Sequence, residues 1–108
     1  MSKYRLIVNP ISGKGHSLKL LPLIESKLKE AGLDYSVVVT QRPWHAAELA
    51  EQAVYEGADT VVAVGGDGTS NEVLNGLMAA KKAGHPAVMG VLSVGRGNDF
   101  AFGAGIPT

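Results

Sequence analysis

The sequence has no cysteine, which excludes disulfide bonds and thiolate chemistry and favours a reducing compartment. It also has no excess of charge, because ten basic and ten acidic residues balance in a chain of 108. This balance argues against nucleic-acid binding and against a strongly basic membrane-docking face. No apolar run is long enough to span a bilayer, and the amino terminus lacks the pattern of a signal peptide. We expect one globular domain in the cytoplasm.

Glycine is the residue present in excess, with 14 copies. Because glycine alone enters positive φ without steric cost, clusters behind apolar runs indicate special backbone geometry rather than a flexible linker. Most of the glycines fall into such clusters, at Gly13, Gly15, Gly65, Gly66, Gly68, Gly95, Gly97, Gly103 and Gly105.

Short apolar runs alternate with amphipathic segments along the chain. Strands are expected at 4–8, 35–40, 60–64 and 87–92, and helices at 17–31, 44–55 and 69–82. Thr69 and Glu72 fit a capping box at the start of the third helix. A short helical turn is expected at 98–101, and the tail after it carries no core pattern. The alternation predicts an α/β fold of three layers, a mostly parallel sheet with helices on both faces.

The sharpest functional signal is the stretch Gly65-Gly66-Asp67-Gly68-Thr69, between a strand and a helix. Glycines let backbone amides approach a phosphate, and a helix amino terminus adds unpaired N–H groups and partial positive charge. Asp67 would hold Mg²⁺ directly or through water, or fix the loop by accepting its amides. The alternative is a tight turn without a ligand, in which Asp67 is a cap. The spacing favours the ligand.

Two further loops would lie at the same edge of a parallel sheet, where ligands gather beyond the carboxyl ends of the strands. Asn9-Pro10-Ile11-Ser12-Gly13-Lys14-Gly15-His16 suits anionic oxygens but matches neither a Walker A loop nor a dinucleotide fingerprint, and a flexible loop with a solvated Lys14 explains it equally well. The other loop is Gly95-Arg96-Gly97-Asn98-Asp99. Arg96 could pair with a phosphate, whereas Asn98 and Asp99 could simply cap the next turn.

Thr40 comes shortly before the second expected helix, and Trp44 is the expected first residue of that helix. Thr40 ends a strand at the same edge, so its hydroxyl could reach a ligand, although β-propensity also explains a threonine there. Trp44 is expected to pack against the start of the helix, and stacking on a base is the less favoured alternative.

Three ordered blocks together resemble the diacylglycerol kinase catalytic domain family, which includes bacterial lipid kinases, sphingosine kinases and ceramide kinases. The blocks are NPISGKG at 9–15, GGDGTSNEVLNG at 65–76 and GRGNDFA at 95–101, and they cover essentially the whole chain. The second block alone would also fit NAD kinases and, more loosely, phosphofructokinases. The first and third blocks favour the lipid kinase branch.

The resemblance implies an amino-terminal domain of the NAD kinase and phosphofructokinase type, and ATP- and Mg²⁺-dependent phosphorylation of a lipid hydroxyl. Asp67 would be indispensable, near the phosphates and the metal. The residues implied at the nucleotide are Asn9, Pro10, Ser12, Gly13, Thr40, Gly65, Gly66, Asp67, Gly68, Thr69, Asn98 and Asp99. Arg96 stands where the family usually has threonine, so a hydroxyl contact is either lost or exchanged for a charge–phosphate contact.

The family also resembles two-domain proteins about two to three times this size. Residues 1–108 are therefore expected to be an excised or truncated nucleotide-binding domain, without the carboxyl-terminal domain that supplies the general base and most of the lipid site. We expect negligible kinase activity from this chain alone, self-association through exposed apolar surface, and peripheral contact of the whole protein with the inner face of the membrane. An NAD kinase-like half and a non-catalytic nucleotide-binding module are the alternatives.

Overall fold

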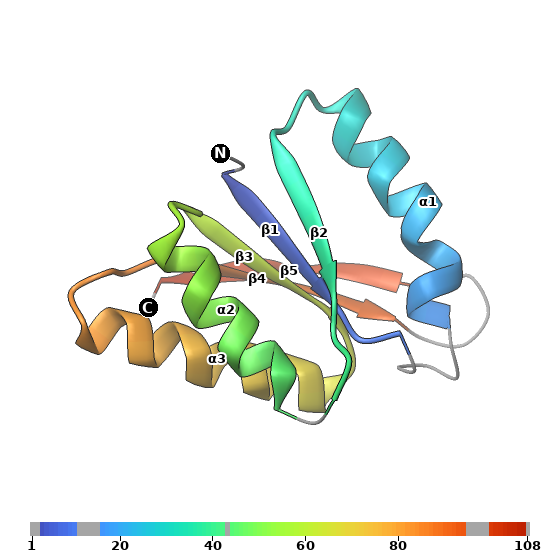
Figure 1. Cartoon of the computed structure of the whole chain (residues 1–108). Coiled ribbons are helices and arrows are strands. Elements are labelled where there is room, and N and C mark those ends of the chain that lie inside the picture. Colours follow the sequence, from blue (N-terminus) through green and yellow to red (C-terminus); the bar gives the residue numbers. More distant parts are fainter. Residues whose placement is uncertain (1–2, 11–15, 43, 95–99, 108) are drawn as a thin grey trace.

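The computed structural model describes residues 3–10, 16–42, 44–94 and 100–107. The elements are β1 (Tyr4–Val8), α1 (His16–Glu30), β2 (Tyr35–Val39), α2 (His45–Tyr55), β3 (Thr60–Gly65), α3 (Asp67–Lys82), β4 (Val88–Val94) and β5 (Phe100–Pro107). They form a five-stranded sheet in the order β2-β1-β3-β4-β5 (Figure 1). The first four strands are parallel, and β5 runs antiparallel to β4.

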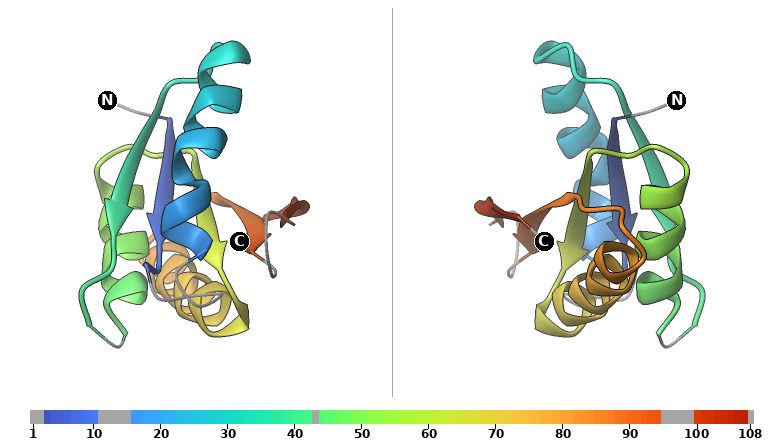
Figure 2. Two further views of the ribbon diagram at one scale, coloured as in Figure 1. Left: turned by 90° about the vertical axis from the view of Figure 1, so that its right-hand side faces the viewer. Right: turned by 90° about the vertical axis from the view of Figure 1, so that its left-hand side faces the viewer.

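Helices cover both faces of the sheet, and alternate residues of the strands enter two separate cores. Leu6 and Val8 join Ile24 of α1 in one core, whereas Ile7 and Val61 pack with buried residues of α2 and α3 in the other. Figure 2 shows α1 lying on the opposite side of the sheet from α2 and α3. The predicted three-layer α/β fold with a mostly parallel sheet is therefore confirmed.

A glycine sets the spacing between α2 and α3. A Cβ atom built on Gly76 of α3 would overlap the carbonyl oxygen of Ala47 and lie 3.0 Å from the Cβ atom of Ala50. The α2 face that meets α3 is made of small buried residues, including Ala46, Ala50 and Ala53. Close approach of two helices needs small side chains at the contact, and here it brings the first turn of α2 against the middle of α3.

The third helix begins at Asp67, two residues before the predicted start, so the expected capping box was wrong. Its N-cap is Gly66, in extended conformation at φ −101°, and Thr69 lies inside the first turn. The cause lies in the preceding residue, since Gly65 has a φ of 155°, which residues with side chains rarely adopt. This geometry turns the chain at the end of β3, and the helix starts at once.

The carboxyl-terminal segment is a strand, so the predicted helical turn at 98–101 and the patternless tail were wrong where the structure describes them. Strand β5 pairs with β4, with Phe100 opposite Val94 and Phe102 opposite Leu92. The pairing satisfies the backbone groups along that side of β4, which a sheet edge would leave open. Glycines at 103 and 105 hide the usual pattern of a strand. Residues 98 and 99 lie outside the described residues.

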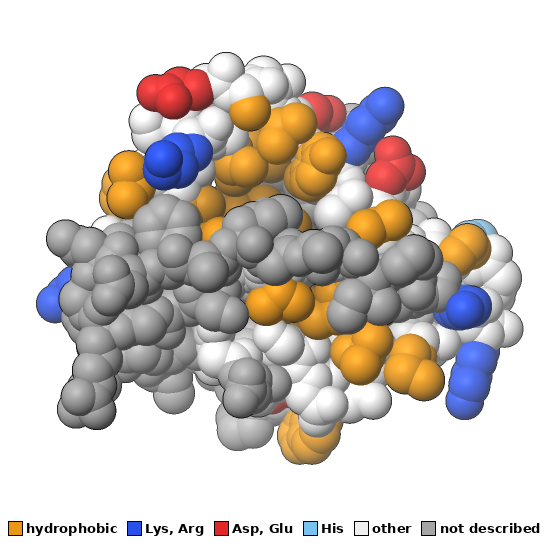
Figure 3. All heavy atoms as spheres, turned by 180° about the vertical axis from the view of Figure 1, so that it is seen from behind, with side chains coloured by type: hydrophobic (Ala, Val, Ile, Leu, Met, Phe, Trp, Pro, Cys, Tyr) orange, Lys and Arg blue, Asp and Glu red, His pale blue; other side chains and the backbone are white. Residues whose placement is uncertain are grey.

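An apolar hollow lies beside α1 on its face of the sheet. It has a volume of about 160 Å³ and is lined by Tyr4, Leu6, Ile24, Lys27, Leu28, Leu33, Val62 and Leu92. Figure 3, viewed from behind, shows hydrophobic side chains exposed beside the atoms drawn in grey. Among the exposed large hydrophobic residues are Leu23 and Val88.

Candidate functional site

The carboxyl ends of β1, β2 and β3 meet at one edge of the sheet. The Asn9 N–H donates to the carbonyl oxygen of Val64 at 3.2 Å, and the Thr40 N–H donates to that of Val8 at 2.8 Å. These hydrogen bonds continue the pairing of β1 with β3 and of β2 with β1 by one residue. They fix Asn9 and Thr40 next to each other, just beyond the ends of their strands.

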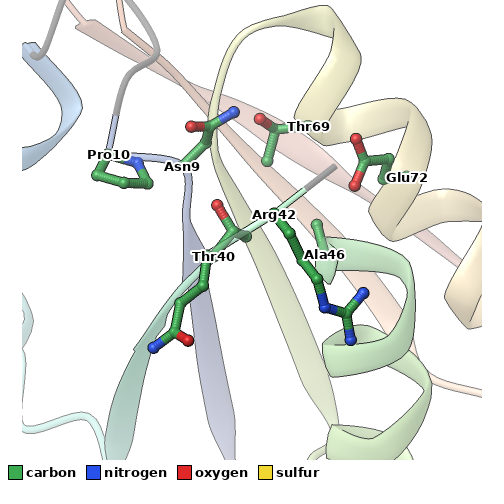
Figure 4. Close-up of a pocket in the computed structure, with 8 residues that line it drawn as sticks. Asn9, Pro10, Thr40, Arg42, Ala46, Thr69 and Glu72 are labelled. Carbon is green, nitrogen blue, oxygen red and sulfur yellow. The ribbon is translucent and has the colours of Figure 1, made fainter. Parts of the chain in front are cut away.

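A pocket of about 290 Å³ opens at this edge. Its walls come from the residues that follow β1 and β2, the first turn of α2 and the first two turns of α3 (Figure 4). The lining residues are Asn9, Pro10, Thr40, Gln41, Arg42, Ala46, Thr69 and Glu72. Two hydroxyls, two amides and both signs of charge thus surround one small space, a composition suited to a polar ligand.

The α3 side of the pocket carries Thr69 and Glu72, which are three residues apart and share a helix face. Thr69 is only 4% exposed, the one polar side chain classed as buried in the described part of the chain. Figure 4 shows the Thr69 hydroxyl and the Glu72 carboxylate on the pocket side of the helix, with the Asn9 amide facing them from the end of β1 just beyond Val8. Hydrogen-bonding groups from two elements therefore converge on the pocket.

The turn before Thr69 has two glycines that the packing of the chain does not require. Gly66 and Gly68 are exposed, neither has a positive φ, and a Cβ atom on either would meet no heavy atom within 4 Å. Among the described residues, nothing excludes an ordinary side chain at either position. The amides of this turn also belong to the start of a helix, where N–H groups lack partners within the helix. Open space in front of unpaired donors is the geometry of an anion site.

Arg42 stands at the mouth of the pocket, held by an ion pair. Its Nη2 and Nη1 atoms lie 2.6 and 3.3 Å from the two carboxylate oxygens of Glu48. The hydrogen bonds from Arg42, together with its charge, lower the pKa of Glu48, and the carboxylate in turn raises the pKa of Arg42. Both side chains are more than half exposed, so the pair orients the guanidinium more than it stabilises the fold.

Backbone contacts fix the segment that carries Arg42. The Gln41 N–H donates to Nδ1 of His45 at 2.9 Å, and the His45 N–H donates to the carbonyl oxygen of Arg42 at 3.2 Å. These two hydrogen bonds link Gln41 and Arg42, which follow β2, to the first residue of α2.

The structure brings together part of the site expected from the sequence. Four of the expected residues line the one pocket, namely Asn9, Pro10, Thr40 and Thr69. The adjacent turn contains Gly65, Gly66 and Gly68, and Asp67 begins α3, with its side chain outside what the structure describes. The remaining expected residues lie outside the described ranges, namely Ser12, Gly13, Arg96, Asn98 and Asp99. Their roles stay predictions.

Four lining residues were missed, namely Gln41, Arg42, Ala46 and Glu72. Glu72 had a usable signal, because it lies one turn after Thr69 on the same face, but it was assigned to a capping box. Trp44, which was expected to pack against the start of α2, is the N-cap of that helix and is 59% exposed.

Two absences concern only the ranges that the structure describes. No three His, Cys, Asp or Glu side chains come together there in a way that would hold a metal ion. None of the helices there combines the length and the apolar character needed to cross a membrane.

Comparison with known proteins gives consistent results. A family model described as the diacylglycerol kinase catalytic domain matches residues 3–108. Enzymes named diacylglycerol kinase from Staphylococcus aureus, strains MRSA252 and Newman, are each 42% identical over 103 residues. The match covers 95% of this chain and 32% of each relative, so the chain spans about a third of their length.

Solved structures agree with the sequence relatives. A crystal structure of a diacylglycerol kinase from Bacillus anthracis strain Sterne superposes with a TM-score of 0.66 and 27% identity, over 91% of this chain and 35% of that one. A solution structure of a phosphate-loop protein matches with a TM-score of 0.52 and 28% identity, over 82% of this chain and 76% of that one. By its motifs, its fold and the family model that spans nearly all of it, the chain belongs to the diacylglycerol kinase catalytic domain family.

Proposed function

We propose that this chain binds ATP with Mg²⁺ at the β3–α3 turn and the neighbouring pocket, as the nucleotide-binding half of a lipid kinase acting on a diacylglycerol-type hydroxyl. The observation that carries the proposal is the pair Gly66 and Gly68. The described residues do not require glycine at either position, and both glycines leave space open toward them at the start of α3. A phosphate group is the ligand that uses such space, since the helix end offers unpaired N–H donors and partial positive charge.

The phosphates would lie over residues 66–69, with the Thr69 hydroxyl as a further donor. Asp67, at the start of α3, would reach Mg²⁺ directly or through water. Magnesium commonly uses one or two carboxylates plus substrate phosphates, so a cage of several protein ligands is not required. Ser12 and Gly13 would close the first loop over the phosphates. Arg96, Asn98 and Asp99 would contribute from the third loop.

The nucleoside would extend from the turn along the first two turns of α3. Glu72 lies in that direction, and a carboxylate repels phosphate but accepts hydrogen bonds from sugar hydroxyls. Arg42 and Thr40 line the opposite wall. The Glu72 carboxylate therefore favours one orientation of the nucleotide, with phosphates at Gly66 and ribose at Glu72.

Phosphoryl transfer depends mainly on positioning and on neutralising the developing charge. These residues would position the nucleotide, whereas the general base and the acceptor site would come from the remainder of a longer protein. The chain spans about a third of its relatives, in line with that division. By itself it is expected to bind ATP weakly and to transfer phosphate negligibly. A lipid acceptor would place the whole protein at the inner face of the membrane.

The test is transfer of the γ-phosphate of ATP by the whole protein that contains this domain. We expect phosphorylation of diacylglycerol in mixed micelles, and a loss of at least about a hundredfold with Asp67→Ala, which removes the group expected at the metal. NAD, offered as the acceptor in parallel, should not be phosphorylated. Phosphorylation of NAD would favour the NAD kinase alternative. ATP binding without transfer to either acceptor would favour a non-catalytic module.

A further inference from the structure

Trp44 has an unusual backbone conformation for its residue type. Its φ is 66° and its ψ is 0°, and it is the one non-glycine residue with positive φ in the described part of the chain. Residues with a Cβ atom enter this left-handed region at a cost, because the Cβ approaches the following carbonyl oxygen. A large aromatic residue is a poor choice where glycine would be free of strain.

The described residues around Trp44 offer little compensation for this strain. The side chain is 59% exposed, so it gains little from burial. Trp44 is the N-cap of α2, yet it makes no side-chain capping hydrogen bond. Within the described residues, no aromatic ring packs against the indole, and the aromatic pair found there is Tyr55 with His85. Burial, capping and local conformational preference therefore all fail to explain a tryptophan here.

The surroundings of Trp44 indicate what it serves. Three residues that line the pocket come shortly before it, Thr40, Gln41 and Arg42, and a fourth, Ala46, follows two positions later. The turn is fixed by the Gln41 N–H bond to His45 and by the ion pair between Arg42 and Glu48. Trp44 is thus an exposed indole that lies in the sequence between the pocket-lining residues Arg42 and Ala46, although it is not itself one of the lining residues.

We propose that Trp44 is a stacking platform for the nucleobase of a nucleotide bound in this pocket. The inference rests on the proposed nucleotide site and adds the residue that recognises the base. The orientation deduced from Glu72 places the nucleoside away from the start of α3 and toward this turn. An indole is the aromatic ring best suited to stack on a purine, and such stacking tolerates different bases. The ligand class is a nucleoside triphosphate, and the ring of its base would contact the indole of Trp44.

Trp44 is the single tryptophan of the chain, so its fluorescence reports on this position alone. The experiment titrates the 108-residue chain with ATP–Mg²⁺ and, separately, with tripolyphosphate–Mg²⁺. Calorimetry gives both affinities independently of the indole. We expect ATP to quench the fluorescence and protect it from acrylamide, and tripolyphosphate to bind without either effect.

Trp44→Gly separates stacking from structure. Glycine removes the platform and relieves the backbone strain, so ATP should bind about fivefold more weakly or worse, tripolyphosphate should bind as before, and the melting temperature should stay level or rise. Trp44→Tyr keeps a ring and should retain most of the ATP affinity. A role confined to the fold would lower the melting temperature and change both affinities together.

Several results would overturn the inference. Equal ATP affinity of the wild type and Trp44→Gly, with tripolyphosphate also bound, would refute stacking and leave the nucleotide site standing. Fluorescence that responds to anionic lipid vesicles and not to ATP would assign Trp44 to a membrane surface. Failure of the wild type to bind either ATP or tripolyphosphate by calorimetry would refute the proposed function, and the inference with it.

Discussion

Gly76 of α3 lies so close to the carbonyl oxygen of Ala47 in α2 that no side chain fits between the helices. Gly76→Ala should therefore push α2 and α3 apart, because the obstacle is backbone and cannot rotate away. Overpacking of this kind costs about 1–3 kcal/mol, which for a domain of this size is a loss of roughly 5 °C or more in melting temperature. Thermal unfolding followed by circular dichroism measures the effect, and an unchanged melting temperature would show that the helices do not pack this closely.

Gly68→Ala is the matched substitution on the same helix, with the opposite expectation. A Cβ atom there meets nothing within 4 Å, and alanine favours a helix over glycine by up to about 1 kcal/mol, so stability should hold or rise. The same Cβ would enter the space assigned to phosphate. Loss of one hydrogen bond to a charged group, at about 1.5–3 kcal/mol, predicts ATP binding weaker by roughly tenfold or more. Calorimetry with ATP and with tripolyphosphate should show the loss for both ligands. Unchanged binding would contradict the assignment of the space beside Gly68 to phosphate.

Glu72 is predicted to accept hydrogen bonds from the ribose. Glu72→Ala should weaken ATP binding by roughly tenfold, yet leave tripolyphosphate binding equal or slightly stronger, because a negative charge has been removed. The affinity for 2′,3′-dideoxy-ATP, which lacks the sugar hydroxyls, should hardly change between wild type and variant. If the dideoxy compound loses as much affinity as ATP, the carboxylate acts on the fold of the pocket rather than on the sugar.

Arg5 and Glu56 give the fold a predictable response to acid. Arg5 Nη2 donates to the Glu56 carboxylate at 2.8 Å, joining β1 to the end of α2, and this hydrogen bond is the main cause of the lowered pKa of Glu56. The folded-state pKa lies below the unfolded-state value, so the stabilisation is present above that value, about 4.3 for glutamate, and is lost as the pH falls through the folded-state pKa. Melting temperatures of wild type and Glu56→Gln should differ near neutral pH and converge in acid. A constant difference across that range would contradict the ion pair.

The sequence was enough for most of the fold, since apolar runs and amphipathic segments locate four strands and three helices to within about two residues. It was not enough where glycine controls the backbone. Gly65 and Gly66 start α3 two residues early, and a propensity argument that looks for a polar cap chooses Thr69 instead. The glycine-rich strand β5 shows no alternation and forms because it pairs with β4. Such pairing is a property of the assembled sheet.

The residues of the site were likewise only partly predictable from the sequence. Asn9, Thr40 and Thr69 were predictable because strand ends and a glycine turn mark the edge of a parallel sheet. Arg42 was not, since its place at the pocket mouth depends on an ion pair six residues along the chain with Glu48. The sequence also does not show that Trp44 has a left-handed backbone. Trp44 lies between Gln41 and His45, which are joined by a hydrogen bond that only the structure reveals.

Binding of ATP–Mg²⁺ at the start of α3 is most directly measured by amide chemical shifts of the isotope-labelled chain, titrated to millimolar ligand. The account predicts saturable shifts at Gly65, Gly66, Gly68 and Thr69, together with Asn9 and Thr40, and much smaller shifts at the far end of α3. A folded sample in which the amide chemical shifts of this turn stay unchanged at millimolar ATP–Mg²⁺ would contradict nucleotide binding at this site.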